Sequence, residues 1–324
     1  MTRSMIGRWF PIAREGYGYR EQSVFVCATC GHVFIYPVLS DQDTIDIVFK
    51  SCGAVPPRSV AWQRAPTTLK PPAAWTTAIR VPSLDETLRP FLKAAVRVLD
   101  VGAHGGDISL NVSLPAGSSV DLLQLENCGA CVAPANRDLS RVREFYGLLS
   151  DLRRAEPDYR ADVILVLQVL EHVADLGGFL ADCRGMLNDD GVLVIEVPYE
   201  PLDALRVARN QYFQLAHHSY FTPWTLRSLL EYNGFVVRQI ELLNHSHTGV
   251  GTDPYVNTRA VCGVRRAPDA PLPPLKGYNF YRSLDFLLGS FGGSIAFLAS
   301  APFVTFHHDP RCGQLASVFE TAPG

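Results

Sequence analysis

Short apolar runs alternate with helical patterns between residues 83 and 265, and this alternation restricts the fold more than any other feature. Turn residues follow the runs, which span residues 96–101, 120–125, 163–169 and 192–197. Strands that are buried on both faces of a parallel sheet are continuously apolar. The pattern therefore predicts an α/β fold, in which helices cover both faces of a mostly parallel sheet.

The last helix and the two strands after it carry the clearest local signals. Thr222 can cap the helix, Pro223 occupies its first turn, and Gly234 can take the left-handed conformation just past its end. Residues 235–242 and 259–264 follow as two strands, which we expect to pair antiparallel at one end of the sheet. At the other end of this region, the sequence Ser-Leu-Asp-Glu at 83–86 predicts a capping box and a helix to about residue 94.

Composition divides the chain into four regions. Residues 1–52 hold a Cys-x-x-Cys pair in a β-prone stretch, and the Pro-rich residues 53–82 predict a linker. Residues 83–265 form the α/β domain, and residues 266–324 form a C-terminal extension. We expect a small zinc-ribbon-like segment, or the remnant of one, in the first region.

Charge and hydropathy exclude some classes of function. With 29 basic and 32 acidic residues the net charge is −3, and no basic run is present, which argues against a nucleic-acid binder and for a small-molecule substrate. Residues 1–16 lack the apolar core of a signal peptide, and eight cysteines in a chain of this length suit a reducing cytoplasm. Residues 286–306 carry no charge, but their Gly, Ser and Pro content favours a buried or interfacial segment over a membrane span.

A glycine turn and an acidic residue predict a nucleoside-containing cofactor. Gly102 and Gly106 follow the first strand, at the sheet edge where open α/β sheets bind ligands. Glu126 ends the second strand, where it can accept hydrogen bonds from both ribose hydroxyls. NAD and an adenosyl cofactor both suit this geometry. However, His104 replaces the middle glycine of the dinucleotide pattern and Asp107 would repel a phosphate, so a cationic, phosphate-free cofactor fits better.

The ordered motifs resemble class I S-adenosylmethionine-dependent methyltransferases. They read LDVGAHGG, then Glu126, then ADVILVLQVLEHVADLGGFLADCRGMLNDDGVLVIEVP, and finally HHSYFTPWTLRSLLEYNGF. The resemblance implies a Rossmann-like sheet of seven strands with the last one inserted antiparallel. It also implies a set of cofactor-binding residues, namely Asp100, Gly102, Ala103, His104, Gly106, Glu126, Asp151, Leu152 and Gln168.

Each part of this set has an implied role. The turn from Gly102 to Gly106 is expected to cradle the methionine, with Asp100 holding the turn, while Glu126 takes the ribose hydroxyls. Asp151 and Leu152 are expected beside the adenine, and Gln168 beside the sulfonium. His104 departs from the glycine that many members have, which puts the local geometry of the turn in question.

Histidines are the candidate catalytic residues. His217 follows the fifth strand, where this family approaches its acceptor, and His172 and Tyr220 are further candidates. Imidazole is the side chain that titrates near neutral pH without perturbation, which suits a general base. The alternative for His172 is a structural role, in which Glu171 and His172 cap and orient the following helix.

A narrower resemblance connects the chain to deoxysugar C-methyltransferases and related polysaccharide-modifying enzymes. Those enzymes carry a His-Glu-His-x-Ser-Tyr block and an N-terminal zinc domain, whereas residues 215–220 here read Leu-Ala-His-His-Ser-Tyr. Ala216 thus replaces the glutamate, which puts a mechanism that needs it in doubt. Cys27 and Cys30 have the form of a zinc knuckle, but residues 1–26 supply no further Cys or His, so a metal-free remnant is the alternative.

The sequence therefore predicts a cytoplasmic methyltransferase that uses S-adenosylmethionine and a His base. The expected acceptor is a small molecule, a sugar or another glycan or natural-product precursor. Three alternatives stay open: a catalytically silent adenosyl-cofactor-binding scaffold, an NAD-dependent oxidoreductase, and a membrane-attached glycan methyltransferase.

Overall fold

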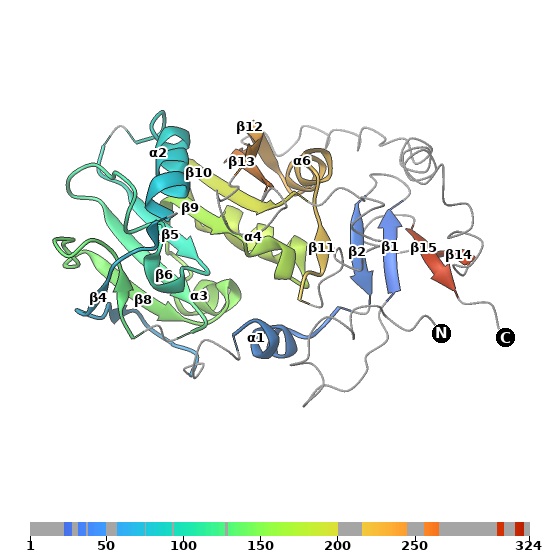
Figure 1. Ribbon diagram of the computed structural model, residues 1–324, viewed down its shortest axis with the longest axis horizontal. Coiled ribbons are helices and arrows are strands. Elements are labelled where there is room, and N and C mark those ends of the chain that lie inside the picture. The colour runs from blue at the N-terminus through green and yellow to red at the C-terminus, as the bar shows by residue number, and fades with distance from the viewer. Residues whose placement is uncertain are drawn as a thin grey trace.

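A large mixed sheet occupies one side of the molecule, and a smaller sheet lies on the other (Figure 1). The computed structural model describes residues 23–27, 32–36, 38–49, 57–74, 76–92, 94–126, 129–199, 216–244, 256–265, 303–307 and 315–320. Within these residues the sheet has eight strands in the order β12-β13-β10-β9-β5-β6-β8-β3. Their bounds are β3 Gln63–Arg64, β5 Arg97–Val101, β6 Ser119–Gln124, β8 Val142–Tyr146, β9 Ala161–Leu167, β10 Leu187–Pro198, β12 Phe235–Asn244 and β13 Val256–Val264.

The strand directions confirm the predicted α/β class. β10, β9, β5, β6 and β8 run parallel to one another, whereas β13 pairs antiparallel with both β10 and β12. The predicted antiparallel insertion is therefore present. The sheet has one strand more than the expected seven, because β3 from the Pro-rich segment pairs antiparallel with the outer edge of β8.

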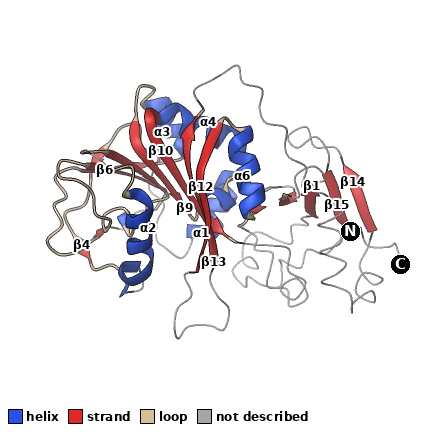
Figure 2. Ribbon diagram, turned by 90° about the horizontal axis from the view of Figure 1, so that it is seen from above, coloured by secondary structure: helices blue, strands red, loops and turns tan. Residues whose placement is uncertain are grey.

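Helices cover both faces of the sheet (Figure 2). Leu149, Leu180 and Leu226 pack on one face from three different helices, and Leu84 and Leu88 pack on the other. The helices are α2 Val81–Leu88, α3 Leu149–Ala155, α4 Leu176–Met186 and α6 Pro223–Tyr232. Two separate apolar cores thus hold the sheet in place, as a doubly covered sheet requires.

Residues from the N-terminal region join a second, smaller sheet. Its order is β11-β2-β1-β15-β14, with bounds β1 Ser23–Cys27, β2 Val33–Tyr36, β11 Ser219–Tyr220, β14 Phe303–His307 and β15 Leu315–Glu320. β11 lies just before α6 and pairs antiparallel with β2, so that the small sheet continues from the large domain. The side chain of Thr44, on helix α1 (Asp41–Phe49), also contacts His218, with 3.2 Å between Oγ1 and Nε2.

Several local predictions differ from the observed elements. α2 begins at Val81, without a side-chain cap at Arg80, and ends at Leu88, so the predicted capping box at Ser83 does not form. A π-helix at Thr76–Arg80 runs directly into α2, so the helical segment begins before Ser83, and Pro82 lies in the first turn of α2. Residues 188–191, Asn-Asp-Asp-Gly, have the composition of a turn but lie inside β10, where the pairing with β9 shifts register between Leu187 and Val192.

The Pro-rich segment contributes two short strands. β3 extends the large sheet, and β4 Leu69–Lys70 pairs parallel with β7 Cys131–Val132.

Among the described residues, no helix is both long and apolar enough to cross a membrane. Most of the uncharged segment 286–306 lies outside the described residues, and its last four residues fall in β14. The cytoplasmic location stays a prediction.

Candidate functional site

A cavity of about 1000 Å³ opens at the carboxyl ends of β5, β6 and β9. Its wall includes residues that end or follow these strands, among them Asp100, Glu126 and Gln168. Thr44 and Ile45 of α1 line the same cavity. The chain therefore builds this site from the edge of the large sheet together with one helix of the N-terminal region.

The glycine turn after β5 has the conformation that its sequence predicts. Gly102 has a φ of 74°, and the amides of Gly102 and Ala103 donate to the carbonyl of Leu123 on β6 at 2.8 and 3.2 Å. A Cβ atom on Gly102 would overlap the side chain of Val169, so the turn is packed too closely for a larger residue. Gly106 also has a positive φ, of 81°.

The predicted ribose-binding acid lies at this turn. Glu126 is buried and lines the cavity, and its carboxylate accepts a short hydrogen bond from Nδ1 of His104. This contact raises the pKa of His104 above its ordinary value. His104 has a φ of 45°, a conformation that glycine adopts more readily. The residue that departs from the family pattern is thus the partner of the acid.

Asp100 lies at the end of β5 and faces the same cavity. Its side chain is buried, and this burial raises its pKa from 3.8 to about 7. A cationic ligand in the cavity would favour the charged form of this carboxyl group. The acidic groups at this end of the cavity therefore suit a positively charged cofactor.

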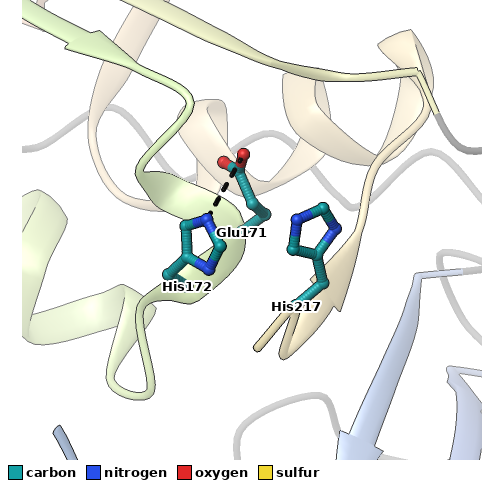
Figure 3. Close-up of side chains that lie close together, drawn as sticks. All are labelled: Glu171, His172 and His217. Carbon is teal, nitrogen blue, oxygen red and sulfur yellow. Dashed lines mark ion pairs between the residues drawn. The ribbon is translucent and has the colours of Figure 1, made fainter. Parts of the chain in front are cut away.

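Glu171, His172 and His217 meet beside the cavity (Figure 3). Glu171 and His172 belong to the turn after β9, and His217 precedes β11. The ring centroids of the two histidines lie 4.9 Å apart, and Nδ1 of His172 donates to the carbonyl of Ala216 at 2.8 Å. His172 lines the cavity, while Glu171 and His217 are buried.

The environment of the histidines changes their acid–base properties. Burial lowers the pKa of His172 to about 4, and His217 nearby contributes to the same shift. Burial likewise lowers the pKa of His217 to about 4. Both rings are therefore neutral at physiological pH, so that each can accept a proton or bind a metal ion through a lone pair. They are weaker bases than the sequence suggested.

A family model described as "Methyltransferase domain" matches residues 73–240, just over half of the chain. This chain belongs to the methyltransferase domain family. The match confirms the sequence prediction of a class I S-adenosylmethionine-dependent methyltransferase domain, whereas the narrower deoxysugar resemblance is not part of this finding.

Curated relatives carry the names of methyltransferases. The chain is 32% identical over 111 residues to a ubiquinone biosynthesis O-methyltransferase of Azorhizobium caulinodans. The matched region covers 34% of this chain and 42% of that protein. The chain is 27% identical over 141 residues to the protein of the same name from Bradyrhizobium diazoefficiens, covering 44% of this chain and 53% of that one. The chain thus spans about half the length of these relatives.

A solved structure of Burkholderia thailandensis 1,6-didemethyltoxoflavin-N1-methyltransferase, with bound S-adenosylhomocysteine, has a TM-score of 0.43 to this chain. The two share 20% identity, over 59% of this chain and 80% of the other.

S-adenosylmethionine is the cofactor of this methyltransferase domain, and the residues of the cavity fit it. Asp100 and Glu126 give the cavity an acidic lining, which suits the sulfonium and ammonium groups of the cofactor. A Cβ atom at Gly102 would overlap Val169, so this position of the turn stays without a side chain, and a ligand can approach the backbone there.

Of the remaining predicted cofactor residues, Gln168 lines the cavity, whereas Asp151 and Leu152 do not. Gln168 has a φ of 61°. Its backbone N–H donates to the backbone carbonyl of Glu196 at 2.7 Å. The carboxylate of Asp151 instead accepts from the amide of Leu148 at 3.0 Å and so caps α3. The neighbouring Leu148, Leu149 and Ser150 form the wall.

Tyr220 does not line this wall. Tyr220 is buried on β11, with its ring centroid 6.2 Å from that of His217. Cys27 ends β1, and Cys30 lies outside the described residues, so zinc binding by this pair stays a prediction.

Sequence reasoning missed two parts of the site. Thr44 and Ile45 of α1 belong to no recognisable sequence motif. Their place at the cavity depends on a contact with His218, which is distant in the sequence. Glu171 was interpreted only as part of a helix cap, although it lies in the same cluster as the two histidines. Its position beside His172 in a turn after a strand was the available signal.

Proposed function

We propose that this protein transfers the methyl group of S-adenosylmethionine to an oxygen atom of a small-molecule acceptor. One observation carries the proposal: a single cavity is lined by the glycine turn and Glu126 and also by His172. The predicted cofactor-binding residues and one candidate acceptor-side residue, His172, therefore face the same space. The family assignment supports methyl transfer as the chemistry of that space.

The chain's own residues mainly bind and position the reactants. In this proposal the turn at Gly102 and the carboxylate of Glu126 hold the cofactor, which when bound supplies an electrophilic methyl group on a sulfonium. The acceptor oxygen gains the methyl group as the carbon–sulfur bond breaks, and its proton passes to the His172 and His217 side or to solvent. Positioning of the two reactants in the cavity provides much of the acceleration in such a displacement.

The acceptor atom and the acceptor class have different support. The names of the curated relatives favour an oxygen atom, since each is an O-methyltransferase. The resemblance of residues 215–220 to the deoxysugar enzymes favours a sugar or a related glycan or natural-product precursor. We therefore propose a hydroxyl group on such a precursor, with small phenols as the competing acceptor class.

Two measurements test this function. Calorimetry should show S-adenosylhomocysteine binding to the purified protein, and Glu126→Gln should weaken it by at least about tenfold, because a buried charged hydrogen bond is lost. Glu231→Gln changes a partly exposed acid on α6 and serves as the matched control. Absence of binding by the unaltered protein would contradict the proposal.

The second measurement identifies the acceptor. The protein is incubated with cofactor carrying a deuterated methyl group and a pool of nucleotide sugars and small phenols, and products are detected by mass spectrometry. Release of the label as deuterated methyl iodide on heating with hydriodic acid identifies a methyl ether, because a C-methyl group is not released. Cofactor binding without any labelled product, even in single-turnover reactions, would favour the silent scaffold.

A further inference from the structure

Three possible metal ligands converge from two separate segments of the chain. A carboxylate oxygen of Glu171 and one ring nitrogen each of His172 and His217 lie within 4.8 Å of one another (Figure 3). Two imidazoles and one carboxylate form the protein ligand set of catalytic zinc sites and of non-haem iron sites. We propose that Glu171, His172 and His217 bind one divalent transition-metal ion.

The orientation of His172 suits a metal ligand. Its Nδ1 atom lies 2.8 Å from the carbonyl oxygen of Ala216, which can only accept, so the proton of the neutral ring is on Nδ1. Nε2 then carries the lone pair, and it lies 3.9 Å from Oε1 of Glu171. Metal-binding histidines commonly donate their other ring N–H to a carbonyl or carboxylate in this way, which fixes both tautomer and orientation.

The backbone holds the two ligand segments together. The amide of His218 donates to the carbonyl of Glu171 at 2.7 Å, and the Ala216 carbonyl that orients His172 belongs to the residue just before His217. Pairing of β11 with β2 fixes the same segment from its other side. Small side-chain movements can bring the three atoms to the roughly 2 Å bond lengths of a zinc site.

The position of the cluster suggests what the ion would do. Glu171 and His217 are 1% and 8% exposed, whereas His172 forms part of the cavity wall. An ion held there has protein on one side and the cavity on the other, which leaves a coordination position for an oxygen ligand.

This role rests on the proposed function. The ion would bind the acceptor hydroxyl and lower its pKa, so that its proton is released to solvent. The oxygen then forms the new bond to the methyl carbon as the carbon–sulfur bond breaks, with S-adenosylhomocysteine as the other product. The metal thus replaces the free imidazole base expected from the sequence.

Ion binding can be measured without any acceptor. The full chain, carrying Cys27→Ser and Cys30→Ser to remove the other predicted site, is stripped with a chelator and titrated calorimetrically with ZnCl₂. We expect one equivalent to bind. Glu171→Gln, His172→Asn and His217→Asn should each weaken binding by at least about tenfold, as losses at metal sites typically do. Glu231→Gln, a change at a partly exposed acid of α6 outside the cluster, should not.

Co²⁺ provides a second readout that depends on the ligands themselves. The visible spectrum of the Co²⁺-loaded protein should indicate nitrogen and oxygen ligands, without thiolate charge transfer, and should change in Glu171→Asp even if Glu171→Gln fails to fold. The proposal is overturned if the unaltered cluster binds no ion, or if binding is equal in all cluster variants that remain folded. S-adenosylhomocysteine binding without ion binding would remove only this inference, whereas loss of cofactor binding alone would remove the proposed function.

Discussion

His104 donates to the carboxylate of Glu126 at the wall of the cavity, so the acid expected to hold the ribose already has a partner within the same chain. Ribose hydroxyls that bind Glu126 must displace this imidazole or share the carboxylate with it. The contact therefore couples cofactor binding to the state of a residue that the glycine pattern does not predict.

His104→Gly should tighten S-adenosylhomocysteine binding by about tenfold. The change removes the competing hydrogen bond, which is worth roughly 1.5 kcal/mol when one partner is charged, and gives the left-handed position the residue that adopts it most readily. Calorimetry against the unaltered protein measures the effect. Weaker binding would instead show that His104 helps to hold the cofactor.

The same pair makes cofactor binding depend on pH. Because Glu126 raises the pKa of His104, the ion pair is fully present below the ordinary histidine pKa and is lost as pH rises through the raised value. Cofactor affinity of the unaltered protein should therefore increase with pH over this range. His104→Gly should lack this component, and an identical pH profile for both proteins would contradict the interpretation.

Asp100→Asn should change how thermal stability depends on pH. Burial raises the pKa of Asp100 from 3.8 to about 7. The contribution of this group to the free energy of unfolding is therefore fully present below the unfolded-state pKa of 3.8, and it is lost as pH rises through the folded-state pKa of about 7. The melting temperature of the unaltered protein should therefore fall more than that of the variant between about pH 4 and about pH 7. Thermal denaturation at both pH values tests this, and parallel losses would argue against it.

Gly102→Ala should destabilise the fold and abolish cofactor binding. A left-handed φ costs a non-glycine residue about 1–2 kcal/mol, and the new Cβ would also overlap Val169. Gly117→Ala is the matched control, because φ there is also positive but the new Cβ would lie an ordinary 3.5 Å from Ala95. Adding Val169→Ala should recover part of the loss at Gly102, as measured by melting temperature and calorimetry.

Arg259→Met should be strongly destabilising. Nη2 and Nε of Arg259 lie 2.7 and 3.0 Å from Oε2 of Glu196, and both side chains are buried between β13 and β10. Loss of one partner from a buried ion pair typically costs about 3–5 kcal/mol, and Glu196 keeps a second partner in Arg80 at 3.2 Å, which places the cost toward the lower end of this range. Urea denaturation measures this loss of stability. Adding Glu196→Gln to the Arg259→Met variant should recover part of the lost stability. Arg227→Ala, which breaks an exposed pair with Glu231, should cost under about 1 kcal/mol.

The order of the large sheet could be predicted because its signals are local. Continuous apolar runs indicated the parallel strands, and Thr222, whose Oγ1 accepts from the amide of Thr225 at 3.3 Å, marked the start of α6 as expected. β3 escaped prediction because Gln63 and Arg64 are two exposed polar residues with no periodicity. It joins the sheet only through its pairing with β8.

The sequence indicated individual candidate residues, but it did not indicate which of them contact each other. Glu126 and His104 each stood out in the sequence, yet nothing local indicated that they bond to each other. Glu196 lay inside an apolar run, and its partner Arg259 is 63 residues away. Asp151 caps α3, a local contact that the position of an acid in the sequence does not distinguish from a place beside the adenine.

The contact between His32 and Ser219, 3.2 Å from Nε2 to Oγ, joins residues 187 positions apart and has a consequence for synthesis. Translation delivers β2 and α1 long before β11 exists to receive them. The glycine turn and Glu126 emerge in between, so the half of the cavity formed by β5 and β6 can assemble on the ribosome first. The contact of Thr44 with His218, which places α1 at the cavity, can form only after His218 has left the ribosomal exit tunnel. The cavity is therefore completed after its β5 and β6 part.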